Sequence, residues 1–477
     1  MAGDVDGASP QGTGRTGGRA ATTGVIAGQY ALSVGRPPTD PPEGWAWTLL
    51  TDVAALESGH TPSRRHEEYW GGSICWIGIR DATENHGQTI WQTVQTVTEL
   101  GLANSSARLL PANTVCLSRT ASVGYVVVMG TPMATSQDFV NWVCGPKLDH
   151  RFLKSVLLAE RSSYRMFSHG TTHQTIYFPE VKAFHVCLPP LPEQRAIAHV
   201  LGAIDDKIDL NRRMSSTLEE MARALFTSWF VRFDPVRAKM AGQPTGLPAH
   251  IEAMFPDALV DSELGEVPEV WGVGPLSSIA SLARVTINPL HYPDETFAHF
   301  SLPAFDDGQL PLLERGALIQ SNKFHLTDDV VLLTKLNPHI ARNWMAIRSA
   351  THRSVASTEF MPFRAVEGSS REFLYLLFDS VGFRPQYLSL VSGTTGSHQR
   401  VQPPAVLAIE IVLPPADIVG EFTRLVAPML GEAVAMRARN QSLASLRDTL
   451  LPKLVSGEVR ITDPEAFLRR AGLDTAA

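Results

Sequence analysis

Apolar residues recur every three or four positions in two long stretches of this chain, and this spacing predicts two long helices. The repeat is close to seven residues, which is typical of a coiled-coil seam, and Asn211 and Asn440 are its polar interruptions. From Glu193 to Trp229 the first helix would span about 55 Å at about 1.5 Å per residue. Pro428 lies inside the second pattern and predicts a kink or a delayed start. The residues that mark the two seams, and that would face a partner, are Ile204, Leu218, Leu225, Trp229, Met429, Leu443, Leu450 and Leu454.

The chain also repeats itself. Leu188-Pro189-Pro190 reappears as Leu413-Pro414-Pro415, and a long apolar-periodic stretch follows each copy. The repeat unit is therefore a globular module plus a long helix, far longer than a solenoid repeat of about 20–50 residues. Each helix could pack on its own module, or the two helices could pair antiparallel; their matching lengths and registers favour pairing. Two copies suit a partner that also has two halves, such as a bipartite DNA site. The shorter repeats are Pro42–Trp45 with Pro268–Trp271, and Gly170-Thr171-Thr172 with Gly393-Thr394-Thr395.

Between the helices the pattern is different. Short β-branched runs broken by Gly, Pro and Asn, such as Tyr125–Val128, predict mixed, strand-rich modules. A helix is expected at 150–162, and Ser456-Gly457 should follow the end of the second long helix. The predicted fold class is α+β, with two repeated modules separated by an antiparallel pair of long coiled-coil helices. The expected divisions are a disordered tail at 1–40, module one at 41–187, the first helix at 188–232, a connector at 233–265, module two at 266–412, the second helix at 413–459 and a C-terminal tail at 460–477.

Composition and charge narrow the function classes. The net charge of −7 argues against a stand-alone nucleic-acid binder, so DNA binding would need local basic patches or a basic partner. The start, Met1–Pro10, has no apolar core of a secretory signal, and no apolar run reaches the about 18 residues of a membrane span. The four scattered cysteines form no CxxC pair and are expected to be reduced thiols. We therefore expect a cytoplasmic protein.

Catalytic motifs are missing from the sequence. There is no phosphate-binding GxxxxGK[ST] loop and no HExxH or His/Cys ligand spacing. Asp40–Glu43 has a slight likeness to the base-stacking loop of amino-methyltransferases, but Glu43 cannot stack on a flipped base. Pro256-Asp257 is followed by no lysine that would complete a nuclease site. We therefore predict a chain with no catalytic residues, no metal and no cofactor of its own.

Several strings resemble one known family. Leu188–Arg195, Ile208–Arg213 and Met221–Phe230 are similar to the central conserved region of the specificity (S) subunit of type I restriction–modification systems. Leu446–Leu454 resembles the distal conserved region of that family. The resemblance covers about residues 41–460, while the N-terminal tail matches nothing in the family pattern. In module one, the strings that resemble target-recognition-domain motifs are Ser58–Pro62, Tyr69–Gly72 and Ser105–Asn113.

The resemblance implies an architecture and a set of partners. Two target-recognition domains would be held apart by the helix pair, and each would read one half of a double-stranded DNA site. The helices would bind two methyltransferase (M) subunits and, through them, two restriction/translocase (R) subunits. S-adenosylmethionine, ATP and Mg²⁺ would belong to those partners. A scaffold that only joins other proteins is the alternative, but it leaves two elaborate modules unexplained.

Candidate base-reading residues follow from their chemistry. Arg suits guanine, and Asn or Gln suits adenine, while Ser and Thr serve either. The repeated Gly-Thr-Thr string is the strongest candidate, although a solvated or turn-capping role is the alternative for every one of these residues. In module one they are Arg64, Arg65, Arg119, Ser122, Gln137, Thr171, Thr172 and Gln174. In module two they are Lys323, Lys335, Asn337, Arg342, Thr394, Thr395, His398, Gln399 and Arg400.

Overall fold

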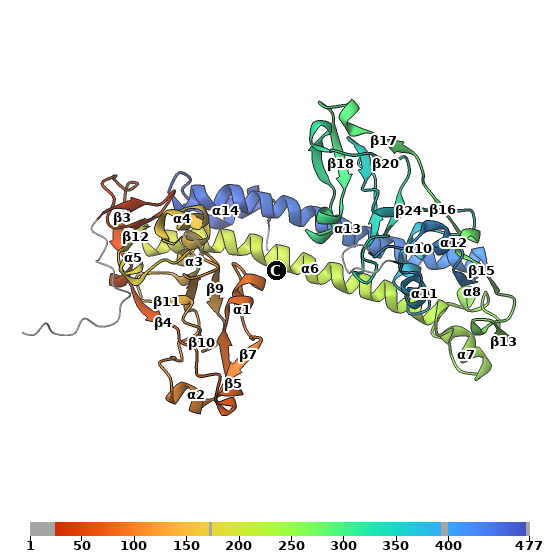
Figure 1. Ribbon diagram of the computed structural model, residues 1–477, viewed down its shortest axis with the longest axis horizontal. Coiled ribbons are helices and arrows are strands. Elements are labelled where there is room, and N and C mark those ends of the chain that lie inside the picture. Colours follow the sequence, from red (N-terminus) through yellow and green to blue (C-terminus); the bar gives the residue numbers. More distant parts are fainter. Residues whose placement is uncertain (1–23, 171–173, 393–398, 474–477) are drawn as a thin grey trace, which may run out of the picture. The chain divides into compact units, whose positions relative to one another are not determined.

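The computed structural model describes residues 24–170, 174–392 and 399–473 (Figure 1). The chain divides into two compact units, one formed by Met1–Lys207 with Leu443–Ala477 and the other by Ile208–Ser442. Each unit holds one globular module and part of both long helices, α6 (Leu191–Phe230) and α13 (Ala416–Val455). The finer domain boundaries expected from the sequence stay a prediction. Among the helices of the described segments, none is long and apolar enough to cross a membrane.

Module one contains three sheets, and one of them has the strand order β10-β5-β7. Its largest sheet has the strand order β4-β11-β8-β9-β6, and its central strands β8 and β9 are buried along their whole length. A third sheet, β1-β2-β12-β3, joins the ends of the module. The elements are β1 (Ile26–Ala27), β2 (Leu32–Val34), β3 (Ala46–Leu49), β4 (Ala54–Ser58), β5 (Trp70–Ile77), α1 (Ile79–Glu84), β6 (Thr89–Ile90), β7 (Gln95–Val97), α2 (Glu99–Ala103), β8 (Val115–Ser118), β9 (Val126–Met129), β10 (Ala134–Thr135), β11 (Phe139–Cys144), α3 (His150–Ala159), α4 (Tyr164–Phe167), α5 (Phe178–Lys182) and β12 (Phe184–Leu188).

Module two repeats this topology. Its sheet order β16-β24-β21-β22 matches β4-β11-β8-β9, and the parallel pair β18 and β23 matches β5 and β10. The repeated, strand-rich module predicted from the sequence is therefore confirmed. The elements of unit two outside the long helices are α7 (Asp234–Met240), α8 (Ala249–Glu252), β13 (Leu259–Ser262), β14 (Gly265–Pro268), β15 (Gly272–Pro275), β16 (Ala280–Leu282), β17 (Thr286–Ile287), β18 (Thr296–Phe300), α9 (Leu302–Asp306), β19 (Leu312–Arg315), β20 (Lys323–Leu326), β21 (Val330–Thr334), β22 (Asn343–Ala346), β23 (Arg353–Ala356), β24 (Phe360–Ala365), α10 (Arg371–Phe378), α11 (Arg384–Ser389), α12 (Pro403–Leu407) and β25 (Glu410–Leu413).

The two long helices pair antiparallel, as predicted. The Asn211 side-chain amide donates to the Asn440 side-chain oxygen at 2.9 Å, so the two polar interruptions of the seam meet. Four residues further along α6, the Ser215 hydroxyl donates to the Ala433 carbonyl at 3.3 Å. Rising numbers on α6 thus meet falling numbers on α13. A buried polar pair in an otherwise apolar seam is a known means of fixing the register of two helices.

The ends of α13 test two expectations. The helix begins at Ala416, well before Pro428, so the expected delayed start is wrong. Proline is tolerated there because its side chain lies on the exposed face of the helix, where water can reach the carbonyl that loses its N–H partner. The helix ends at Val455, and Gly457 then adopts a φ of +77°, as the Ser-Gly signal predicted.

The seam residues divide by burial. Ile204, Trp229 and Leu454 are buried, whereas the others are partly exposed. Near its end α6 also packs on module two, since Phe230 lies against Phe422 with ring centroids 4.9 Å apart and against Phe373 at 5.0 Å. Within unit two the helices therefore pair, as the contact with Phe422 of α13 shows, and α6 also contacts module two, which is not its own module. Only α13 packs there on its own module, since the ring centroid of Phe422 lies 6.5 Å from that of Phe373 of α10. The partly exposed seam residues are Leu218, Leu225, Met429, Leu443 and Leu450.

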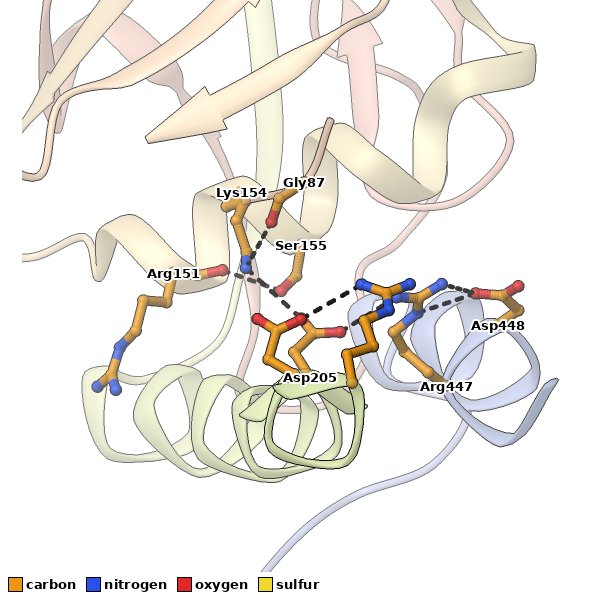
Figure 2. Close-up of polar contacts among 9 residues, drawn as sticks. Gly87, Arg151, Lys154, Ser155, Asp205, Arg447 and Asp448 are labelled. Atoms are coloured by element: carbon orange, nitrogen blue, oxygen red, sulfur yellow. Dashed lines mark hydrogen bonds and ion pairs between the residues drawn. The ribbon is translucent and has the colours of Figure 1, made fainter. Parts of the chain in front are cut away.

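In unit one a charged junction ties the module to both long helices (Figure 2). Lys154 of α3 points toward Asp205 of α6 with its ammonium 3.6 Å from the carboxylate, and it donates to the Gly87 carbonyl at 3.1 Å. Arg447 of α13 approaches the same Asp205 carboxylate at 3.1 Å and also bonds Asp448. One carboxylate thus holds cations from two other helices.

The N-terminal segment corrects the sequence analysis. Residues 24–40 were expected to be disordered, but β2 pairs antiparallel with β12 and its three residues are buried. The reason is the buried carboxylate of Glu160, which accepts backbone N–H groups from the four successive residues 29–32 at 2.7–3.1 Å. A carboxylate in this position supplies the partners that a strand so short cannot find in a sheet ladder. Residues 1–23 of the expected tail lie outside the described residues.

The C-terminal tail carries a further helix that the sequence analysis missed. Asp463 caps α14 (Pro464–Arg470) by accepting the Ala466 N–H at 3.0 Å. The imidazole of His199 on α6 lies 3.0 Å from the Glu465 carboxylate, and Arg460 forms an ion pair with Glu193. These contacts attach residues 460–470 to the start of α6, all within unit one.

Candidate nucleic-acid interface

Two loops meet beside the end of β8 in module one, and we call residues 119–122 with 174–176 the module-one clasp. The Arg119 N–H donates to the Asp138 carbonyl at 2.7 Å, and the Arg119 carbonyl accepts the Ile176 N–H at 2.8 Å. The Ala121 N–H then donates to the Gln174 carbonyl at 3.2 Å. These backbone bonds fix the clasp whatever side chains it carries.

The same arrangement follows β21 in module two, where residues 335–337 with 399–401 form the module-two clasp. The Lys335 N–H donates to the Glu359 carbonyl at 2.9 Å, and the Lys335 carbonyl accepts the Val401 N–H at 3.1 Å. The Asn337 N–H donates to the Gln399 carbonyl at 2.9 Å. The same set of backbone hydrogen bonds therefore occurs in both modules.

Backbone angles support this equivalence. Ala121 has a φ of +59° and Asn337 a φ of +49°, although non-glycine residues rarely adopt positive φ. Arg119 therefore corresponds to Lys335 and Gln174 to Gln399. The side chains differ at Arg119 and Lys335 and at Ala121 and Asn337, while glutamine is kept at 174 and 399.

Side chains around the module-one clasp come from three more segments. The Arg119 guanidinium donates to the Gln137 carbonyl at 3.1 Å and lies over the Phe178 ring at 4.8 Å. Burial lowers the pKa of Arg119, and within the described segments its buried Nε has no hydrogen-bond partner. The exposed Gln137 side chain accepts the hydroxyl of Thr61. A contiguous polar surface thus joins Thr61, Gln137 and the clasp.

Arg64, Arg65 and Ser122 complete the predicted module-one set. The Arg64 guanidinium lies over the Trp70 ring at 4.3 Å and donates to the Gln95 side chain at 2.9 Å, which holds it at the surface. Arg65 is exposed next to it. Ser122 lies in the clasp, where its carbonyl accepts the Ser118 hydroxyl at 2.5 Å.

The module-two clasp carries four of the predicted residues. Arg400 is exposed and donates to the Glu359 carboxylate at 3.0 Å, while Lys335 and Gln399 are half-buried. Among the described residues the buried side-chain oxygen of Asn337 has no hydrogen-bond partner. The exposed Arg400 and the half-buried Lys335 are the basic groups of this clasp that could donate to a base edge.

Two predicted residues lie outside this clasp. Lys323 is only 7% exposed on β20, where its ammonium donates to the Ser321 hydroxyl at 2.6 Å and burial lowers its pKa. Arg342 forms a two-pronged ion pair with Asp306, with both distances 2.8 Å. These placements disfavour a direct base contact for either residue. Five other predicted residues lie outside the described residues, namely Thr171, Thr172, Thr394, Thr395 and His398.

The sequence analysis missed the acidic residues that anchor the clasps. Asp138 precedes β11 and Glu359 precedes β24, and the backbone carbonyl of each holds the basic residue of its clasp. An acid directly before a Phe that starts a strand, in Asp138-Phe139 and Glu359-Phe360, is the signal that could have found them.

A second surface lies on α6 within unit two. Leu210, Met214 and Met221 are 42%, 43% and 50% exposed. Their spacing of four and seven places them on one face of the helix. The sequence analysis placed the partner-binding residues on the inner seam, whereas this apolar stripe lies on an exposed face of α6.

The described part of the chain contains no group of three or more His, Cys, Asp or Glu side chains that could hold a metal ion. Its four cysteines are free thiols. Burial raises the pKa of Cys187 to about 12, so this thiol is protonated at neutral pH.

Comparisons with known proteins agree with this geometry. Residues 42–220 match the family model described as the type I restriction modification DNA specificity domain. The specificity subunit of the type I restriction enzyme MjaIX of Methanocaldococcus jannaschii is 26% identical over 439 residues, which cover 88% of this chain and 95% of that protein. The HindI specificity subunit of Haemophilus influenzae is 25% identical over 350 residues, with coverage of 61% and 72%.

The fold has a counterpart among solved structures. The crystal structure of the type I restriction–modification S subunit from M. genitalium aligns with a TM-score of 0.55 at 13% sequence identity, covering 87% of this chain and 97% of that chain. At this identity the likeness concerns the fold alone. The family match over residues 42–220 and the two relatives show that this chain is similar to type I restriction–modification specificity subunits, as its motifs indicated.

Proposed function

We propose that this chain is the non-catalytic DNA-reading subunit of a cytoplasmic type I restriction–modification complex. Each module binds one half of a bipartite double-stranded site through its clasp. The observation that carries this proposal is the clasp itself, which is built twice with the same backbone hydrogen bonds and different side chains.

The clasp chemistry suits base edges in the major groove. Arg119 can bind guanine through two hydrogen bonds, and the amides of Gln137 and Gln174 can bind adenine in the same way. Module two carries Lys335 in place of Arg119 and Asn337 in place of Ala121, while Gln399 matches Gln174, so its half-site differs. Sequence discrimination of about 1–3 kcal/mol per well-formed contact is expected from such pairs.

The helix pair supplies the second part of the proposal. Two M subunits bind it, and the exposed stripe of Leu210, Met214 and Met221 is the docking face on α6. Two R subunits join through the M subunits. S-adenosylmethionine, ATP and Mg²⁺ act in those partners. Because the chain carries a net charge of −7, the partners share the phosphate contacts.

A module exchange tests the reading role. Replacing residues 45–187 with the first module of another family member should change one half of the methylated sequence in a host that also expresses the M subunit. The reciprocal exchange of residues 268–412 should change the other half, and methylome sequencing reads both outcomes. If the chain were a scaffold without sequence preference, neither exchange would move the site; a change in both halves at once would refute one reader per module.

A further inference from the structure

A basic cavity lies directly beside the module-one clasp. Its volume is about 570 Å³, and two arginines stand on its rim. Both of these guanidinium groups are exposed, and neither was among the residues that the sequence analysis selected. The cavity is lined by Val123, Arg161, Ser162, Tyr164, Arg165 and Gln174.

The two arginines are available to a ligand. Within the described ranges neither Arg161 nor Arg165 has a carboxylate within ion-pair distance. The acid nearest in sequence, Glu160, is fully buried and bound to backbone N–H groups of residues 29–32, so it faces away from the cavity. Arg161 rests over the Tyr125 ring at 5.7 Å, which positions its guanidinium without using its donors.

The fold couples the cavity to the clasp. Gly124 has a φ of +95°, and a Cβ at this position would lie 2.8 Å from the ring of Tyr164. Tyr164 is buried, and its hydroxyl donates to the Leu157 carbonyl at 2.7 Å. Gly124, two residues after the clasp, therefore packs closely against Tyr164, and Tyr164 lies between Arg161 and Arg165 in sequence. Gln174 belongs both to the clasp and to the cavity wall.

We infer that Arg161 and Arg165 bind phosphates of the DNA backbone that flank the half-site read by the module-one clasp. This inference rests on the proposed reading function and assigns a second, sequence-independent contact to the same module. Guanidinium groups match phosphate oxygens with paired N–H donors, and unpaired exposed arginines lose little when they bind an anion. Such contacts set the position of the protein on the duplex, while the clasp distinguishes the bases.

Module two is built differently at the equivalent place. Arg161-Ser162-Ser163-Tyr164 is repeated as Arg384-Pro385-Gln386-Tyr387 at the same spacing from the Gly-Thr-Thr string. Arg384, however, donates to the carbonyls of Pro338 and His339 at 3.0 and 3.2 Å, and Leu388 stands where module one has Arg165. The phosphate contact is therefore a property of module one alone.

Salt dependence of DNA binding tests this inference. The complex of the full chain with its M subunits is titrated with a duplex that carries the methylated site, at several salt concentrations. Each phosphate neutralised contributes about 0.9 to the slope of log affinity against log salt, so R161A/R165A should lower that slope by about 1.8. R161K/R165K keeps both charges and should keep the wild-type slope. The methylated sequence should be unchanged in both variants.

Two controls make the result specific. R80A/R151A removes two charges from the same module, but both arginines already lie beside carboxylates, so the slope should stay at the wild-type value. R384A should also leave the slope unchanged. An unaltered slope in a folded R161A/R165A complex that still binds its site would overturn the phosphate contact while leaving the reading function intact. An altered methylated sequence would show that these arginines read bases instead. If the wild-type complex showed no preference for the site, the proposed function itself would fail.

Discussion

At the scale of single residues, the repeated turn before each module contains a mismatch. Gly44 has a φ of +78° in the Pro42–Trp45 turn, whereas the equivalent Val270 has a φ of +67° and is 82% exposed. A β-branched residue in the left-handed region costs about 1–2 kcal/mol of folding free energy. Glycine removes this strain, but part of the gain is lost because glycine raises the conformational entropy of the unfolded chain. V270G should therefore raise the free energy of unfolding by about 0.5–1 kcal/mol.

The first module provides the matched control. A Cβ at Gly44 would meet no atom within 4 Å, so G44V tests the backbone angle and nothing else. G44V should destabilise the protein by at least the amount that V270G stabilises it, as measured by denaturant unfolding followed by circular dichroism. Equal stability of V270G and the wild type would mean that the turn relaxes without cost.

The predicted base-reading residues stay a prediction, but the structure brings several of them together in the two clasps. Arg119 and Gln174 come together because the backbone of residues 119–121 hydrogen-bonds that of residues 174–176, which no local sequence pattern indicates. Lys323 and Arg342 were selected by residue type alone. Burial and ion pairing depend on contacts with Ser321 and Asp306, which no pattern within a single strand indicates.

At the scale of elements, the long helices were predictable because forty residues of regular spacing give a strong signal. The strands β1 and β2 were missed because two or three residues cannot show a period, and the residue that stabilises them, Glu160, is about 130 positions away in sequence. The sequence around β1 and β2 therefore cannot indicate that Glu160 stabilises them. The same holds for α14, whose attachment to α6 depends on the distant His199.

The exposed stripe on α6 leads to a prediction about assembly. M214D/M221D places charges where an apolar partner surface would bury them, which costs several kcal/mol when they stay unpaired. The variant should lose its complex with the M subunits in sedimentation velocity experiments, yet keep its melting temperature, since both side chains are exposed. Leu225 from the predicted seam is a poorer choice because it packs partly against the core of unit two.

The matched control introduces the same two negative charges at exposed polar positions of α6 and α13, outside the apolar stripe. Ser216 and Gln441 are exposed, so S216D/Q441D should bind the M subunits like the wild type. An intact complex for M214D/M221D would rule out this face of α6 as the docking surface. Loss of the complex in both variants would point to net charge and not to the stripe.

At the scale of the whole molecule, the repeat was the part of the fold that the sequence revealed most clearly. The three-residue string Leu-Pro-Pro and the turn before Trp45 and Trp271 occur at nearly constant offsets, because the two modules that lie between them have almost the same length. The modules have diverged in sequence, so the equivalence of Arg119 with Lys335 became visible only from backbone hydrogen bonds. The backbone arrangement of the clasps is therefore the same in both modules, although their side chains differ.

The helix pair also leads to a prediction about the unread gap between the two half-sites. Asn211 and Asn440 are hydrogen-bonded across the seam, so positions after Arg213 and after Ala438 lie opposite each other. Inserting four residues at both places lengthens each helix by about one turn of 5.4 Å. DNA rises about 3.4 Å per base pair, so the methylated site should gain one to two unread base pairs while its specified bases stay the same.

Four residues also rotate the seam by about 40°, and some activity should be lost to repacking. An insertion of seven residues in both helices restores the seam and should lengthen the gap by about three base pairs, at about 1.5 Å per residue. Insertion in α6 alone should prevent pairing, because the polar residues of the two helices would no longer meet. Methylome sequencing decides the matter: an unchanged gap in an active double insertion would mean that something other than the helix pair sets the distance between half-sites.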